Sequence, residues 1–233
     1  VPIGGRPLLG HVLAALAGAP GLARIRISVE AAAEPALRAV AERAGVAVEF
    51  VPARATIPDS LYAAADGADG PYVVTTADNV LLTALAVRQV AARLAAGDDA
   101  IVALARKKDV LAAHPTGQRR FYRFRDGSYS NCNLYGLSAG GLDLAEAFRS
   151  GGQFAKNPRR LVEAVGLMNL VLLRYGLVSL PSGMRRLGRR FGLAASAVVL
   201  KDGAHAIDVD NARTYSIAAE LLARRAGGAL SPA

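Results

Sequence analysis

Short runs of strand-forming residues alternate with longer helical runs along much of this chain. The run 24-RIRISVE-30 alternates with the period of two expected for a strand. The next run, 34-EPALRAVAERA-44, has the spacing of an amphipathic helix and ends before Gly45. This alternation is typical of β–α–β units, so we expect an α/β fold with a three-layer, Rossmann-like mixed sheet. Further strands are expected at 46–51, 72–76, 100–105, 195–200 and 204–210, and further helices at 7–17, within 56–67, at 82–96 and in a final segment ending near 225.

The pattern changes after residue 106. The segment 119–137 is expected to form a hairpin, because Asp126-Gly127 is a strong turn signal. Residues 139–192 are predicted to be mostly helical and to form an insertion, or sub-lobe, within one domain spanning 1–233. A chain of this length is sufficient for a single large core.

Charge and cysteine content narrow the classes of function. The formal charge of +9 and the isoelectric point near 10.2 favour an anionic ligand or surface, although a solvated basic surface would give the same values. The only cysteine is Cys132, which excludes a disulfide framework and indicates a reducing, cytoplasmic location. The longest apolar run, 165–173, is too short to span a bilayer.

Two segments carry aspartate at the end of a predicted strand. The apolar run 72–76 leads to Asp78, and a later predicted strand contains Asp208 and ends at Asp210. Each segment precedes a helix, so these carboxylates could simply cap the helix. Ligands of open α/β sheets, however, bind beyond the carboxyl ends of strands, where two carboxylates could share one Mg²⁺. Such a site suits phosphoryl or nucleotidyl transfer.

Five segments, in the right order, resemble those of the MobA-like nucleotidyltransferases. The run 1-VPIGGRPLLGHVLAAL-16 resembles the segment that follows the family's glycine-rich signature, and 73-VVTTADNVLLT-83 resembles its strand end carrying a metal-binding aspartate. The run 56-TIPDSLYAAA-65 resembles the helix start beside the nucleotide. The run 131-NCNLYGL-137 resembles the family's acceptor-facing strand, and 206-AIDVDNARTYSIAAELL-222 resembles its closing acidic element.

The resemblance also has local departures. Val80 stands where the family usually has proline, and Thr214 replaces a late acidic residue. The glycine-rich loop, which holds the triphosphate in the family, would lie upstream of Val1. We expect about 20–30 preceding residues in the native protein to carry this loop and the first strand.

The resemblance implies a fold of the nucleotide-diphospho-sugar transferase type and a Mg²⁺-dependent nucleotidyltransferase. Such an enzyme joins an NTP, with CTP or GTP favoured, to a phosphorylated small-molecule or lipid-like acceptor and releases pyrophosphate. The roles implied by the matched positions are metal binding by Asp78 and Asp210 with Asp208 as a further ligand, nucleotide binding by Pro2, Ser60, Thr76 and Asp78, and acceptor binding by Asn133 with Arg119 or Arg120.

Three alternatives remain open from the sequence. A metal-dependent glycosyltransferase of the GT-A type would share the fold and use a nucleotide-sugar. A non-catalytic module would bind nucleotide without turnover. A basic protein could contact a membrane surface through 165–192, where 184-MRRLGRRFG-192 places four arginines beside apolar residues. Nucleic-acid binding is disfavoured, because alternating aromatics such as Phe121 and Phe124 usually belong to the core. The sequence does not predict an oligomeric state.

Overall fold

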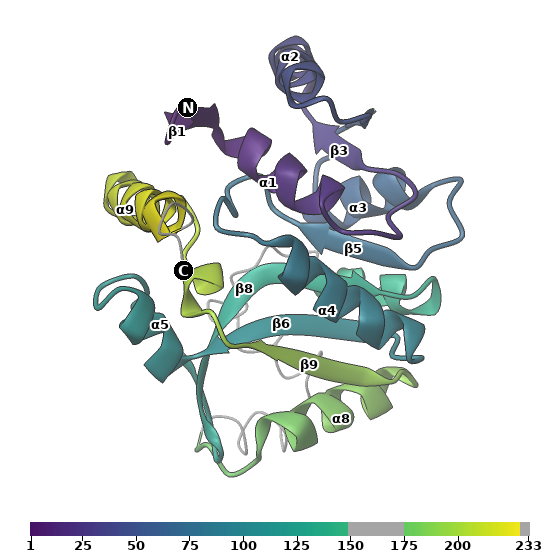
Figure 1. Cartoon of the computed structure of the whole chain (residues 1–233). Helices are drawn as coiled ribbons and strands as arrows, with labels where there is room; N and C mark the ends of the chain where they lie inside the picture. The colour runs from purple at the N-terminus through teal and green to yellow at the C-terminus, as the bar shows by residue number, and fades with distance from the viewer. Residues whose placement is uncertain (149–174, 229–233) are drawn as a thin grey trace.

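A mixed β-sheet lies between two layers of helices in the computed structural model, which describes residues 1–148 and 175–228 (Figure 1). The strand at one edge of the sheet is antiparallel to its neighbour, and the strand at the other edge is parallel to its neighbour, so the sheet is mixed. In spatial order the strands are β5 (Tyr72–Thr75), β8 (Gly127–Leu137), β6 (Ala100–Arg106) and β9 (Ala195–Leu200), with β7 (Tyr122–Phe124) also paired to β8. Strand β8 is antiparallel to β5, β6 and β7, whereas β6 and β9 are parallel.

Helices and tight helical turns connect these strands. The α-helices are α1 (Leu8–Ala17), α2 (Glu34–Ala44), α3 (Ile57–Ala65), α4 (Ala84–Ala95), α5 (Lys107–Ala113), α8 (Leu180–Phe191) and α9 (Ala212–Gly228). The 3₁₀ segments are η1 (Ala31–Ala33), η2 (Gly140–Phe148) and η4 (Gly203–Ala206).

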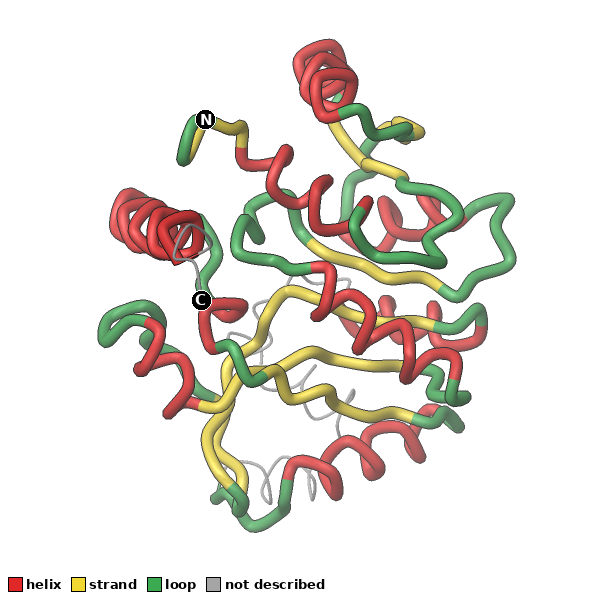
Figure 2. Tube along the Cα trace, viewed as in Figure 1, coloured by secondary structure: helices red, strands yellow, loops and turns green. Residues whose placement is uncertain are grey.

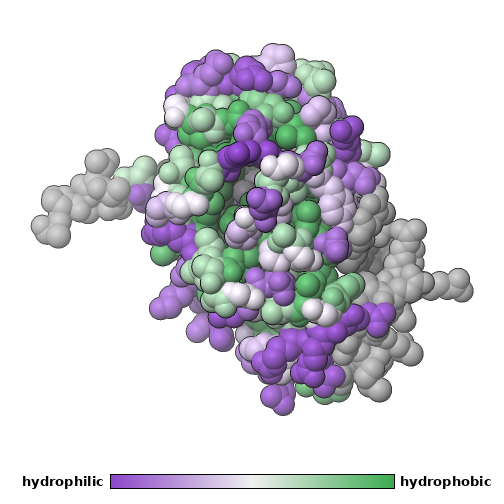
Figure 3. Space-filling view, turned by 90° about the vertical axis from the view of Figure 1, so that its right-hand side faces the viewer, coloured by the Kyte–Doolittle hydropathy of each residue, from purple (hydrophilic) through white to green (hydrophobic). Residues whose placement is uncertain are grey.

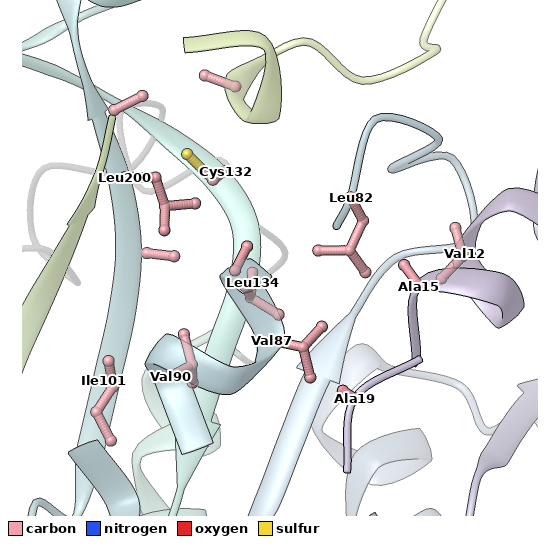
Figure 4. Close-up of a cluster of buried hydrophobic side chains, with 14 of the residues drawn as sticks. Val12, Ala15, Ala19, Leu82, Val87, Val90, Ile101, Cys132, Leu134 and Leu200 are labelled. Atoms are coloured by element: carbon pink, nitrogen blue, oxygen red, sulfur yellow. The ribbon is translucent and has the colours of Figure 1, made fainter. Parts of the chain in front are cut away.

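Strand β6 shows why the sheet has helices on both faces. Its run of apolar residues is continuous, as expected for a strand buried on both sides. Ile101 and Ala103 point into a core formed with α1 and α4, part of which is drawn in Figure 4. Leu104 belongs to a second core on the opposite face, together with Leu180 of α8. The predicted three-layer α/β architecture is therefore confirmed.

Two smaller strand pairs lie outside the main sheet. The parallel pair β3 (Arg26–Val29) and β4 (Glu49–Pro52) has α2 between its strands in sequence, as a β–α–β unit should. The second pair, β1 (Pro2–Ile3) and β2 (Arg6–Pro7), is a short antiparallel hairpin that leads into α1. In Figure 1, the β3–β4 pair and α2 lie on the α1 side of β5.

The segment 204–210 is not the strand that the sequence predicts. It contains η4 and then irregular chain, as the trace in Figure 2 shows. The Asp202 side chain accepts a 2.9 Å hydrogen bond from the backbone N–H of Ala204 and thereby starts the turn. Ala204, His205 and Ala206 are all buried, so the apolar residues enter the core as a turn rather than on alternate faces of a strand.

The hairpin at 119–137 forms, but its first strand is short. Phe124 pairs with Gly127 across the turn, and β7 begins only at Tyr122. Arg119 and Arg120 therefore precede the strand. The backbone amides of both arginines instead donate to the Gln118 side chain, at 2.8 and 3.1 Å, which turns the chain before the strand.

The predicted insertion over 139–192 lies partly outside the described residues. Its described parts, η2 and α8, are helical, whereas the apolar run 165–173 falls between them and is not described. Its boundary as a sub-lobe stays a prediction. Among the described helices, none is both long enough and apolar enough to cross a membrane.

Candidate functional site

Asp78 lies just beyond the carboxyl end of β5, in a turn that its own backbone helps to define. The Val80 N–H donates to the Asp78 carbonyl at 2.9 Å, and the Thr76 hydroxyl donates to the Asp78 carboxylate. Helix α4 begins several residues later and is capped by Thr83, whose hydroxyl accepts from the Ala86 N–H. The helix-cap interpretation of Asp78 is therefore wrong, and its carboxylate is left for another role.

A backbone hydrogen bond joins the two aspartate-bearing segments. The Val209 N–H donates to the Asp78 carbonyl at 3.2 Å, although the residues are far apart in sequence. The side chains flanking Val209, those of Asp208 and Asp210, are thereby brought to the end of β5. One carboxylate oxygen from each of Asp78, Asp208 and Asp210 lies within 4.8 Å of the others.

The start of α9 is capped without the use of the Asp210 carboxylate. Asn211 Oδ1 accepts from the Thr214 N–H at 3.1 Å, and the Thr214 hydroxyl accepts from the Asp210 and Asn211 amides at 3.0 and 3.2 Å. These reciprocal bonds satisfy the first amides of the helix much as a capping box does. Thr214 is thus a buried structural residue at the position where the family has an acid.

Ionisation of all three neighbouring carboxylates is unfavourable, because their negative charges repel one another. Burial and the nearby carboxylates of Asp210 and Asp78 raise the pKa of Asp208 to about 6. The Asn133 side-chain amide donates to Asp208 Oδ2 at 2.9 Å and partly opposes this shift. A divalent cation with hard oxygen ligands would remove the repulsion, so this donor set fits Mg²⁺.

Strand β8 presents Asn133 from an unusual backbone conformation. Asn133 has φ of 46°, the left-handed region that asparagine tolerates better than most residues. Its own side-chain oxygen accepts from Asn131 Nδ2 at 3.0 Å, while its amide reaches Asp208. The fixed orientation of this side chain follows from contacts on both of its ends.

Asn79, next to Asp78, connects β5 to β8 through its side chain. Its side chain is 1% exposed, and its amide donates to the Cys132 carbonyl at 2.9 Å and to the Thr75 hydroxyl at 3.1 Å. The Asn79 side-chain oxygen, in contrast, has no hydrogen-bond partner in the part of the chain described. The signal available in the sequence was a polar residue following a buried strand, which does not separate a capping residue from a residue that cross-links strands.

The remaining predicted residues differ in how they are connected to the segments that carry the carboxylates. Pro2 lies at the start of α9, because its carbonyl accepts from the Tyr215 hydroxyl at 2.7 Å. The loop before Arg119 is joined to the same region, since Gln118 Nε2 donates to the Ala206 carbonyl at 3.3 Å. Ser60 is on α3, where its hydroxyl accepts from the Arg54 N–H at 2.9 Å; no described contact joins it to the carboxylates.

Cys132 and His205 are buried among structural residues. Cys132 is 1% exposed, and burial raises the pKa of its thiol, which keeps it protonated. His205 is buried, and burial lowers its pKa, so the ring is neutral and bonds Thr83 Oγ1 at 2.9 Å. Neither group is placed to act as a nucleophile or a base at the carboxylate cluster.

The family model of the MobA-like NTP transferase domain matches residues 1–165. The chain belongs to the MobA-like NTP transferase family. This establishes a nucleotidyltransferase type of domain, as the five sequence segments predicted. Among curated proteins, no sequence matches the chain.

Solved structures share the fold of this chain. A hypothetical transferase from Thermus thermophilus is 28% identical, with a TM-score of 0.75 over 92% of this chain and 88% of the other. A 4-diphosphocytidyl-2C-methyl-D-erythritol synthase from Anaerococcus prevotii has 11% identity and a TM-score of 0.62, covering 96% and 92% of the two chains. A CMP:2-keto-3-deoxy-manno-octonic acid synthetase complexed with CTP has 14% identity and a TM-score of 0.60, covering 97% and 91%. The last two show the shared fold.

Proposed function

We propose that the protein is a Mg²⁺-dependent nucleotidyltransferase that joins a nucleoside monophosphate unit to a phosphorylated acceptor. The observation that carries this proposal is the convergence of Asp78, Asp208 and Asp210 beyond the carboxyl end of β5. Ligands of open α/β sheets bind at this end of the strands. A cation held by the three carboxylates would neutralise charge on the triphosphate.

The reaction balances without a protein nucleophile. An ionised phosphate oxygen of the acceptor attacks the α-phosphorus of the NTP, the bond to the β-phosphate oxygen breaks, and pyrophosphate leaves. The attacking oxygen carries no proton, so no general base is required. The protein's contribution is therefore to position the two substrates and to compensate their charge.

The surrounding residues supply this positioning. Thr76 orients Asp78, and Asn133 orients Asp208, by hydrogen bonds to their carboxylates. Pro2 and Ser60 are proposed to border the nucleotide. Arg119 and Arg120 are exposed and follow the Gln118 contact to the Ala206 carbonyl, which supports a role in binding the acceptor phosphate.

CTP is the first nucleotide to test and GTP the second. Two proteins with this fold carry a cytidine nucleotide in their names, and one of them was solved with CTP. The acceptor is a phosphorylated small molecule or a lipid-like phosphate.

Calorimetry tests the proposal without knowledge of the acceptor. CTP, GTP, ATP and UTP are titrated into the full chain with and without Mg²⁺, alongside Asp78→Asn and the matched control Asp69→Asn, an exposed carboxylate outside the cluster. Mg²⁺-dependent binding of one NTP, lost only in Asp78→Asn, supports the transferase. Binding of nucleotide-sugars with no binding of any NTP would instead favour a GT-A glycosyltransferase.

Turnover is tested by pyrophosphate release with a panel of phosphorylated sugars and polyols. Release that requires both the NTP and one acceptor supports the reaction as written. Tight NTP binding with no release across a broad panel would favour the non-catalytic module.

A further inference from the structure

A cluster of arginines lies beside the start of β8, whereas the carboxylates contact Asn133 farther along the strand. A cavity of about 260 Å³ opens between the β7–β8 turn and the first turns of α8. Four arginines line it together with two serines and two apolar residues, and no acidic residue is among the lining groups. The residues are Arg125, Arg185, Arg186, Arg189, Ser179, Ser182, Leu177 and Val178.

The sequence of α8 explains why the arginines on this helix face outward together. Leu180 and Gly188 are buried against the sheet, and Met184 packs beside them. Positions on the other side of the helix are therefore exposed, and Arg186 and Arg189 are among them. Figure 3 shows hydrophilic side chains gathered at the lower end of the molecule, at the height of α8 in Figure 1.

Charge in this cavity is not balanced by the described part of the chain. Across residues 1–148 and 175–228, no carboxylate forms an ion pair with Arg125, Arg186 or Arg189. Asp126, which follows Arg125 in sequence, accepts a 2.8 Å hydrogen bond from the Leu180 N–H at the start of α8 through its carboxylate. Concentrated positive charge of this kind attracts an anion.

The polar groups suit a phosphate better than a single carboxylate. Arg185 donates to the Ser182 hydroxyl at 3.1 Å, and Ser179 donates to the same oxygen at 3.1 Å, which holds the first turn of α8 in place. Several guanidinium groups around one concave site match the several oxygens of a phosphate. At roughly 30 Å³ per water molecule, the cavity equals about nine waters, enough for a phosphate or diphosphate group.

The cavity is distinct from the carboxylate cluster. Asn133 lies six residues along β8 from Gly127 at the turn, a span of about 20 Å at roughly 3.3 Å per residue. A phosphate held here is too far from the carboxylates to be the one that reacts.

Tyr122 and Tyr175, on the chain segments beside the cavity, are also exposed, at 63% and 69%.

We propose that this arginine-lined cavity is a second anion site, which binds a phosphate group carried either by a soluble ligand or by the headgroup of an anionic lipid. The exposed tyrosines and Leu177 suit contact with the interface of a membrane, whereas the several arginines around one cavity suit a soluble diphosphate. Both sources present the same chemistry to Arg186 and Arg189.

The test compares two charge-matched double variants of the full chain. Arg186→Gln with Arg189→Gln changes the cavity, and Arg43→Gln with Arg88→Gln removes the same charge from exposed positions on α2 and α4. Inorganic pyrophosphate is titrated by calorimetry in the presence of EDTA. Vesicles of phosphatidylcholine, with and without phosphatidic acid, are used for co-sedimentation.

The expected result is a loss of at least about tenfold in affinity for one probe in the cavity variant only, as for removal of charge-assisted hydrogen bonds. Loss for pyrophosphate identifies a soluble ligand, and loss for phosphatidic acid vesicles identifies a lipid headgroup. Equal affinities in both double variants, or no binding of either probe to the unaltered chain, overturn the proposal. Mg²⁺-dependent NTP binding is measured in parallel and stays unchanged in the cavity variant, so this result is independent of the proposed transferase activity.

Discussion

The side-chain amide of Asn133 donates a 2.9 Å hydrogen bond to Asp208 Oδ2 across 75 positions of sequence. This bond joins the strand predicted to face the acceptor to the acidic segment predicted to hold the metal. Because the donor stabilises the ionised form of Asp208, it opposes the effect of burial on the pKa of that carboxyl. The acceptor side and the metal side of the candidate site are thus chemically linked.

Replacing Asn133 by glycine is expected to weaken Mg²⁺ binding about 2- to 10-fold, the usual range for loss of one hydrogen bond. Glycine keeps the left-handed backbone that φ of 46° requires, so folding is little affected. Asn133→Ala loses the same hydrogen bond and adds about 1 kcal/mol of backbone strain. Mg²⁺ titrations followed by thermal unfolding measure the binding, and urea unfolding measures the strain. Equal Mg²⁺ affinity in Asn133→Gly and the unaltered chain would show that the bond does not support the metal site.

Stabilisation by Mg²⁺ is expected to grow as the pH rises through about 6. The folded, metal-free protein has the pKa of Asp208 raised from 3.8 to about 6, so it holds this proton more tightly than the unfolded chain. Its stability without metal therefore falls as the pH rises between these two values and is then level. A cation competes with the same proton, so its binding strengthens over that interval.

Thermal unfolding with and without Mg²⁺, scanned from about pH 5 to pH 8, measures this effect. Asp208→Asn is the matched variant, because it keeps the shape of the side chain and removes the titrating group. The pH dependence of the Mg²⁺ effect is expected to flatten in that variant. An unchanged dependence in Asp208→Asn would assign the proton to another group.

Asn79→Ala is expected to cost about 2–4 kcal/mol of stability, since it leaves one buried and one half-buried acceptor without their donor. The acceptors are the Cys132 carbonyl and the Thr75 hydroxyl, on the two strands that flank the site. Asn79→Asp keeps the volume but buries a carboxylate at a position only 1% exposed, so its loss of stability increases at neutral pH. Gln89→Ala, an exposed change on α4, is the control in urea unfolding. A loss for Asn79→Ala as small as that of the control would contradict the strand cross-link.

Local pattern was sufficient to predict most of the elements that build the sheet. Strand β6 was recognisable because burial on both faces requires a continuous apolar run. Helix α2 was recognisable because burial of one stripe requires apolar residues at helical spacing. The structure of segment 204–210 was not predicted correctly, because its apolar residues are buried by a 3₁₀ turn that Asp202 starts. A short apolar run alone does not distinguish a buried strand from a buried turn.

The candidate site was predictable in its residue types but not in its connections. Asp78, Asp208 and Asp210 were chosen because each follows an apolar run, and the fold brings them together. The bond from Val209 to the Asp78 carbonyl, which joins the segments, involves only backbone and leaves no trace in residue identity. The buried cross-link made by the Asn79 side chain was not predictable for another reason: a polar residue after a buried strand can equally cap a helix.

Gly188→Ala is expected to destabilise the protein by about 2–4 kcal/mol, because α8 approaches the start of β9 at this residue without room for a side chain. A Cβ at Gly188 would lie 2.3 Å from the Leu193 carbonyl oxygen and 2.8 Å from the Ala195 nitrogen, and backbone atoms cannot move aside as a side chain can. Gly227→Ala is the matched control, since a Cβ there meets no atom within 4 Å and alanine favours the helix by up to about 1 kcal/mol. Urea unfolding of both variants separates the packing effect from helix propensity. A Gly188→Ala protein as stable as Gly227→Ala would mean that α8 does not pack this closely against β9, and the arginine cavity at its first turns would then lack a fixed wall.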